Sequence, residues 1–102
     1  MKLYLDTSTN VAILKLDNQV YQEDFGHDMA EKLLGFIHKK LQENHYDWHD
    51  ITEIEFMSGP GSFTGLRIGA TIVNTLIQEL NLDQPPVSVN YGRPANITKE
   101  VK

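Results

Sequence analysis

Residues 58–69, which read SGPGSFTGLRIG, form the segment of this chain best suited to close contact with another group. Glycine has no Cβ, so a phosphate, a substrate or another protein can approach its backbone closely. The segment is not a Walker phosphate loop, because Leu-Arg follows its third glycine instead of Lys-Ser/Thr. It is also not a dinucleotide fingerprint, because its spacing G-x-G-x-x-x-G is one residue too long. The candidate loop residues are Gly59, Gly61, Ser62, Thr64 and Gly65.

The start of the helix expected after this loop carries a cation in an unfavourable position. Thr64 is expected to cap the helix, and Phe63 is expected to pack on Ile68 as a hydrophobic staple. Arg67 would then lie in the first turn, where its charge opposes the helix dipole. Such an arginine either faces solvent or meets a carboxylate or phosphate, and the sequence leaves both interpretations open.

Other side chains could carry chemistry only in a suitable setting. Asp6 ends an expected strand and could face nucleotide phosphates and magnesium, but the TST segment after it favours a turn-stabilising role. Ser8 and Ser62 would be nucleophiles only beside a histidine base. His45 and His49 have helical spacing, yet they fall in an expected connection without a third ligand, which favours exposed loop histidines. We therefore expect no catalytic residue and no metal site.

Composition narrows the functional classes further. The 102 residues carry a formal net charge of −5, which disfavours direct binding to a nucleic-acid backbone. There is no cysteine, so disulfides, thiol catalysis and cysteine-based zinc sites are excluded. The N-terminus is too polar for a signal peptide, and no apolar stretch approaches the length of a membrane span. We expect a cytoplasmic protein without a membrane partner.

Hydrophobic periodicity predicts three strands, a helix, a strand, a second helix and a last strand. These elements fall at residues 3–5, 11–16, 19–25, 28–43, 53–58, 65–80 and 87–89. The expected fold class is α/β, with a mixed five-stranded sheet and two main helices in one domain over residues 1–89. Residues 90–102 are expected to form an extended tail. By analogy, this order is that of a ribonuclease-H-like half-unit of the actin, sugar-kinase and heat-shock ATPase superfamily.

The second helix has more apolar surface than one contact requires. Its apolar residues span roughly 200° of the helical wheel, whereas packing on a sheet needs little more than about 100°. The excess predicts a partner surface on this helix and the first one. Its expected members are Met29, Leu33, Ile37, Phe63, Arg67, Ile68, Ile72 and Leu76.

The string SGPGSFTGLRIGATIVNTL is similar to the signature segment of the TsaB family, a subunit needed to form threonylcarbamoyladenosine in tRNA. The segments LYLDTSTNVAILKL, HDMAEKLLGFIHKKL and PVSVN also resemble that family. The resemblance implies a noncatalytic scaffold that activates a TsaD-like catalytic subunit, which transfers threonylcarbamoyl to tRNA adenosine. The excess apolar arc of the second helix predicts a homodimer in isolation. We further expect only indirect contact with tRNA, no stably bound cofactor, and at most a nucleotide at the partner interface.

A second interpretation stays open beside this one. The chain could be a small nucleotide-binding or hydrolysing enzyme that uses Asp6 and the glycine loop, although it lacks the facing lobe that closes over ATP in that superfamily. The chain is about half the size of TsaB-family members, and its NYGRPANITK segment resembles their closing tail. We therefore expect an internal deletion of the second lobe, with Tyr91 and Arg93 pinning the tail or contacting a partner.

Overall fold

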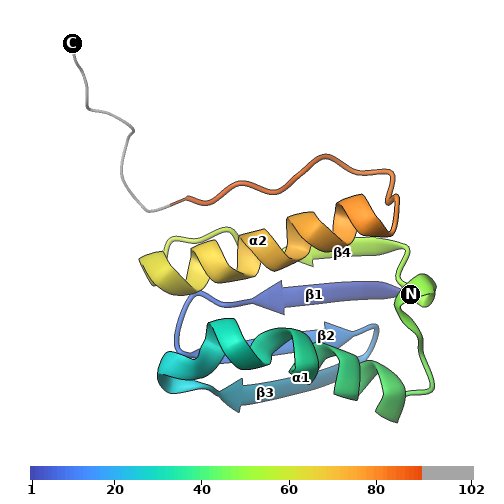
Figure 1. Cartoon of the computed structure of the whole chain (residues 1–102), viewed down its shortest axis with the longest axis horizontal. Coiled ribbons are helices and arrows are strands. Elements are labelled where there is room, and N and C mark those ends of the chain that lie inside the picture. Colours follow the sequence, from blue (N-terminus) through green and yellow to red (C-terminus); the bar gives the residue numbers. More distant parts are fainter. Residues whose placement is uncertain (91–102) are drawn as a thin grey trace.

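The computed structural model describes residues 1–90, and these build a four-stranded sheet covered by two helices (Figure 1). The strands are β1 (Lys2–Asp6), β2 (Val11–Leu16), β3 (Gln19–Asp24) and β4 (Glu53–Phe56). Their order across the sheet is β3-β2-β1-β4. β1 pairs antiparallel with β2 and β2 antiparallel with β3, while β4 lies parallel to β1. The predicted α/β class and mixed sheet are confirmed.

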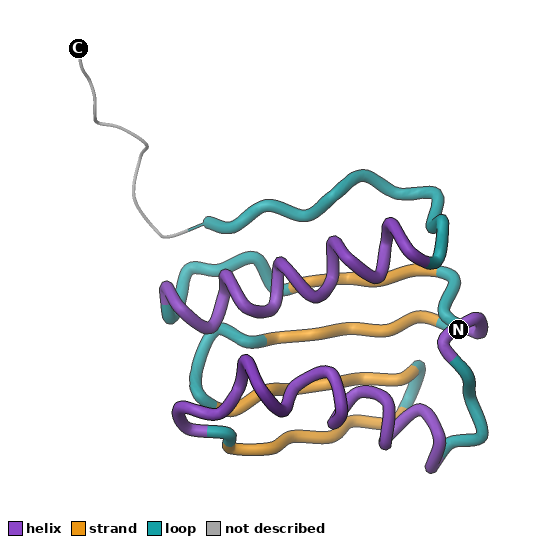
Figure 2. The backbone as a smooth tube through the Cα atoms, viewed as in Figure 1, coloured by secondary structure: helices purple, strands orange, loops and turns teal. Residues whose placement is uncertain are grey.

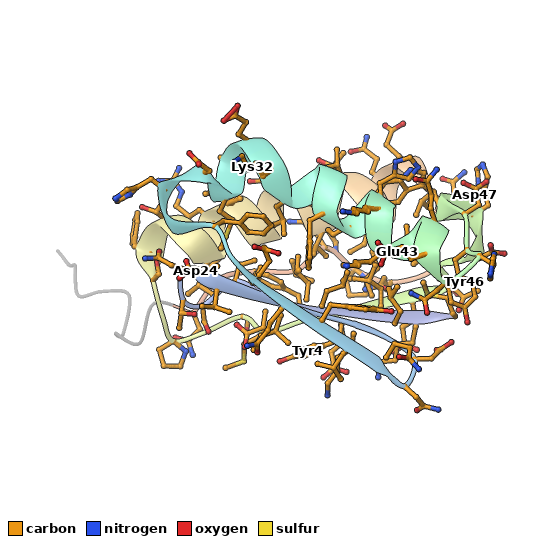
Figure 3. All side chains as sticks on the ribbon, turned by 90° about the horizontal axis from the view of Figure 1, so that it is seen from below. Tyr4, Asp24, Lys32, Glu43, Tyr46 and Asp47 are labelled. Carbon is orange, nitrogen blue, oxygen red and sulfur yellow. The ribbon has the colours of Figure 1, made fainter. Side chains whose placement is uncertain are left out.

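Both helices lie on the same face of this sheet. α1 (Met29–Glu43) follows a short 3-10 turn, η1 (Gly26–Asp28), and packs on β2. A second 3-10 turn, η2 (Trp48–Asp50), leads into β4, and α2 (Phe63–Glu79) packs on β4 and β1. Figure 3, viewed along the sheet, shows the helices on one side and Tyr4 on the other. Residues 1–90 therefore form two layers, and no helix of this part of the chain lies on the other sheet face.

The core fills the space between these two layers. Alternate residues of each strand point toward the helices, as the period of two requires. The fully buried side chains include Leu3, Leu5, Leu14, Leu33, Ile37, Leu41 and Val73. The opposite sheet face carries mixed charges: Lys2 pairs with Glu55 at 2.9 Å, and the Lys15 ammonium lies 5.0 Å from the Tyr4 ring centre. Among residues 1–90, no helix is long and apolar enough to cross a membrane.

The fifth strand, predicted at residues 87–89, does not form. The side-chain amide of Gln84 accepts the Ile54 N–H at 2.9 Å and donates to the Ile54 C=O at 2.8 Å. The amide thus takes the place that the backbone of a neighbouring strand would have at the edge of β4. Asn74 on α2 does the same for Val87, at 2.7 and 3.0 Å. The two prolines at positions 85 and 86 have no N–H to offer a ladder. The five-strand prediction was wrong because side chains, not a backbone ladder, hold this segment.

Residues 81–90 therefore form an irregular strap that runs back along α2 (Figure 2). Its far end is tied down by the Asn90 N–H, which donates to the Ser58 carbonyl at 2.7 Å. Apart from Asn90, the predicted tail at 90–102 lies outside the described residues. The predictions for Tyr91 and Arg93 lie outside them as well.

Different segments of the chain lie at the two ends of the molecule's long axis. The N-terminus and the β2–β3 turn lie at one end, while α1 and α2 both begin at the other (Figure 1). The turns that follow β1 and β4 also reach this second end, so the glycine loop and the two helix starts are brought together there.

Candidate functional site

The glycine loop is packed against the chain's own backbone. A Cβ on Gly61 would lie 2.6 Å from the Ser8 carbonyl oxygen, and a Cβ on Gly65 would overlap the Thr7 carbonyl oxygen. The Ser62 N–H donates to the Ser8 carbonyl at 2.7 Å and fixes this contact. The loop thus closes over the turn that follows β1.

Gly59 has the same kind of neighbour. Its φ of +115° favours glycine, and an added Cβ would overlap the Asn90 carbonyl oxygen. The structure therefore corrects the interpretation that Gly59, Gly61 and Gly65 let an external group approach. The group that approaches them is the strap or the β1 turn.

Ser62, not Thr64, caps α2. The Ser62 hydroxyl oxygen accepts the Gly65 N–H at 3.1 Å, and the helix begins at Phe63. This cap position is two residues earlier than predicted, because both residue types cap helices well and the loop backbone places Ser62 at the junction. Thr64 is exposed in the first turn.

A groove of about 430 Å³ opens where α2 begins beside α1. Its walls are mainly side chains of the first three turns of α2, with one residue from α1. The lining residues are Ala30, Phe63, Thr64, Arg67, Ile68, Thr71 and Ile72. A smaller hollow of about 280 Å³ shares Thr64 and Ile68 with it and extends toward His27. We call the first of these, the 430 Å³ groove with its seven lining residues, the α2 groove.

Exposed apolar side chains are found on both of the helices that form this groove. Phe63 is 56% exposed, and Leu34, one helical turn beyond Ala30 on α1, is 48% exposed. Ile68 and Ile72 are half-buried, because one side of each packs on the core and the other lines the groove. A cluster of large apolar side chains on a surface is typical of a protein-interaction site.

Residues 18–92 match the model of the TsaD family, described as tRNA N6-adenosine threonylcarbamoyltransferase, and this match covers well over half of the chain. The chain belongs to this family. Curated relatives carry the name tRNA threonylcarbamoyladenosine biosynthesis protein TsaB. The protein from Buchnera aphidicola subsp. Baizongia pistaciae is 34% identical over 84 residues, 78% of this chain and 38% of the relative. The Bacillus subtilis protein is 30% identical over 91 residues, 84% of this chain and 40% of the relative.

Solved structures agree with the sequence relatives. YeaZ from Pseudomonas aeruginosa superposes with a TM-score of 0.71 at 31% identity, covering 85% of this chain and 43% of that one. A crystal structure of an uncharacterized protein with similarity to peptidase YeaZ, also from Pseudomonas aeruginosa, gives 0.72 at 31% identity, covering 85% and 42%. The chain thus spans about two fifths of the length of the family members it matches.

The predicted partner surface of this family member divides into two groups. Phe63, Arg67, Ile68 and Ile72 line the α2 groove. The other four are at most 8% exposed and belong to the core, so the prediction is corrected for Met29, Leu33, Ile37 and Leu76. Their side of each helix faces the sheet. Ala30, Leu34 and Thr71 were missed, although the spacing of Ala30 and Leu34 by four residues puts them on one helical face.

Asp6 stabilises a turn, as predicted. Its carboxylate accepts the Ser8 N–H at 2.8 Å and the Ser8 hydroxyl at 2.6 Å. The Ser8 hydroxyl is thus bound to an acid, and the Ser62 hydroxyl caps α2. Both serines that were considered as nucleophiles serve the local structure instead.

The two histidines at helical spacing are exposed and separated by a turn. His45 follows α1 with a φ of +61°, and His49 lies in η2. Within residues 1–90 there is no group of three or more histidine, cysteine or acidic side chains arranged to hold a metal ion. Trp48 of η2 packs on the core edge and stacks on His38 with ring centres 5.4 Å apart.

Proposed function

We propose that this chain is a noncatalytic subunit for threonylcarbamoyladenosine formation in tRNA, and that it binds a TsaD-family catalytic subunit through the α2 groove. The observation that carries the proposal is the groove itself, with exposed Phe63 in its lining and exposed Leu34 one helical turn beyond Ala30. The matched relatives, named for threonylcarbamoyladenosine biosynthesis, support the process. In this proposal the partner carries the transfer of threonylcarbamoyl, and the chain holds that partner in its active form.

The lining of the groove favours a protein over a small molecule. Small-molecule sites place several polar groups so that they converge on the ligand. Here Arg67 is the one charged side chain of the lining, and isoleucine, alanine and phenylalanine supply most of the rest. A protein interface core of this kind is apolar, with arginine and aromatic residues enriched. A standard interface of about 1,600 Å² in total would cover the groove and its borders.

The geometry does not favour the alternative of a nucleotide-hydrolysing enzyme. The Asp6 carboxylate accepts two hydrogen bonds from Ser8, and the chain's own backbone occupies the space beside the loop glycines. We propose instead that no cofactor is bound stably and that a nucleotide, where one is present, lies at the interface with the partner. Because the chain has a net charge of −5, tRNA contact is proposed to come through the partner.

Two further parts of the proposal concern architecture and self-association. The order β3-β2-β1-β4, with β4 parallel to β1, supports assignment as a ribonuclease-H-like half-unit. In the absence of the catalytic subunit, a second copy of the chain would cover the same groove. Homodimer and heteromeric complex would then exclude each other.

Co-purification with the TsaD-family subunit of the same organism tests the proposal. The wild-type chain and the variants Ile72→Glu and Gln78→Glu would each be co-expressed with that subunit and sized by light scattering. Ile72 lines the groove, whereas Gln78 is exposed on the same helix outside the lining. We expect a complex with the wild type and Gln78→Glu but not with Ile72→Glu. Equal recovery of all three complexes would show that the partner binds elsewhere.

A further inference from the structure

Arg67 has an unusual setting at the α2 groove. Its guanidinium lies 5.5 Å from the centre of the Phe63 ring, at the border of the apolar lining. The side chain is exposed. The ion pairs found within residues 1–90 are Lys2–Glu55, Lys32–Asp28 and Lys40–Glu43, so no carboxylate of this part of the chain neutralises Arg67.

The helix itself makes this arginine less favourable. Arg67 is the fifth residue of α2. It therefore begins the second turn and does not lie in the first turn as expected, but it is still near the N-terminal end where the helix dipole is positive. The first turn of α2 contains no acidic residue that would offset either charge. In the free protein the Arg67 guanidinium therefore lies close to the positive end of the helix dipole, although the net charge of the chain is −5. An acidic group brought to this point would relieve both.

We infer that Arg67 is a specificity residue of the α2 groove, and that it selects a partner presenting an aspartate or glutamate beside an apolar helix face. This inference rests on the proposed function. A guanidinium beside an aromatic ring, with no carboxylate of residues 1–90 paired to it, is available to bind a partner's carboxylate with two parallel hydrogen bonds. The isoleucines of the groove would exclude water around that pair and strengthen it.

A protein carboxylate fits this setting better than a phosphate. Phosphate sites collect several donors, such as a run of backbone N–H groups together with a cation. Here the Ser62 hydroxyl already accepts the Gly65 N–H at the start of α2, and the loop glycines face the chain's own backbone. The remaining surface near Arg67 is apolar, which suits the ridge of a partner helix.

The test compares Arg67→Gln, Arg67→Lys and Lys39→Gln in binding to the purified TsaD-family subunit of the same organism. Lys39→Gln is the matched control, because Lys39 is an exposed cation on α1 outside the groove lining. Titration calorimetry would give Kd at several salt concentrations, and circular dichroism would confirm that every variant is folded.

We expect Arg67→Gln to raise Kd at least about tenfold and to flatten its salt dependence, with Lys39→Gln close to the wild type. Arg67→Lys should recover only part of the affinity, because an ammonium lacks the planar pair of donors. A wild-type Kd and salt dependence for Arg67→Gln would overturn the role of Arg67 and leave the proposed function standing. No binding by the wild-type chain would overturn both.

Discussion

Gly61 and Gly65 are used for packing the chain on itself. Their Cα hydrogens face the Ser8 and Thr7 carbonyl oxygens, so the loop and the β1 turn approach more closely than any side chain would permit. The same residue types would be needed if a phosphate approached the loop, and the sequence alone does not distinguish the two situations. What decides between them is the fold, which places the β1 turn where a ligand would otherwise bind.

Substituting these glycines should therefore affect folding stability directly. Gly61→Ala adds a Cβ that meets fixed backbone atoms of Ser8, and we expect the free energy of unfolding to fall by about 1–3 kcal/mol. Gly35→Ala is the control: nothing lies within 4 Å of its added Cβ on exposed α1, and helix propensity should raise stability by up to about 1 kcal/mol. Urea unfolding of the isolated proteins measures both. A neutral Gly61→Ala would mean that the loop is not packed as described.

The hydrogen bonds of Asp17 in the β2–β3 turn should make the free energy of unfolding depend on pH in the acid range. The Lys2 N–H, and then the Tyr46 hydroxyl, donate to its carboxylate and hold the pKa of Asp17 below its ordinary value. A lowered carboxyl pKa contributes stability above the unfolded pKa, and this contribution is lost as pH falls through the folded pKa. When the pH is lowered from neutral to below about pH 4, the free energy of unfolding should fall less for Asp17→Asn than for the wild type, because asparagine does not titrate. Parallel pH dependence of the two proteins in urea unfolding would contradict this.

At the scale of elements, α2 has to satisfy the core and the groove together. Its broad apolar arc was evident from the sequence. The expected division of that arc put Ile68, Ile72 and Leu76 toward a partner; the two isoleucines do line the groove, whereas Leu76 is buried. The structure assigns Val73 to the core, where it is fully buried, and Ile72 beside it to the groove. Such a division depends on how far the helix is rotated toward its sheet, which is a property of the packed molecule.

Charge substitutions should reveal this division. Val73→Glu and Ile77→Glu place an unpaired charge among buried side chains, at a cost of several kcal/mol that exceeds or matches the stability of a small domain. Both should unfold the protein. Ile68→Glu and Ile72→Glu should keep the helical circular dichroism spectrum while losing assembly. If all four unfolded alike, the whole arc would be core and the groove would not be a separate surface.

The strap is the other element whose structure departs from its pattern. PVSVN has the composition of a short strand, but no strand forms there. A pattern of apolar residues cannot show that Gln84 and Asn74, both distant in sequence from their targets, replace the ladder hydrogen bonds. Local polarity predicts a surface residue for each of these amides, and only the tertiary structure supplies their backbone partners.

Gln84→Ala should loosen the strap without unfolding the sheet. The substitution leaves the Ile54 N–H and C=O without their side-chain partner, so the Ile54 amide should exchange with deuterium faster. Gln42→Ala, at an exposed position of α1, serves as the control and should leave that amide unchanged. Unaltered exchange at Ile54 in Gln84→Ala would indicate that the clamp contributes little.

At the scale of the whole molecule, the isolated chain exposes an apolar groove to water. We expect it to self-associate at high micromolar concentration, since large exposed apolar clusters are uncommon on monomers. Adding the TsaD-family subunit should dissociate this homodimer, because both assemblies are proposed to cover the same groove. Light scattering would follow the two steps. A homodimer that survives inside the larger complex would require a second surface.

The two ends of the long axis also decide how this molecule can be handled. The N-terminus and the β2–β3 turn lie far from the starts of α1 and α2 (Figure 1). Asn18 in that turn is exposed and lies outside the α2 groove lining. A dye, an affinity tag or a link to a sensor surface placed at Asn18 or ahead of Met1 would thus leave the groove facing the solution. The protein can thus be attached to a surface through one end while the groove at the other end stays accessible to a binding partner.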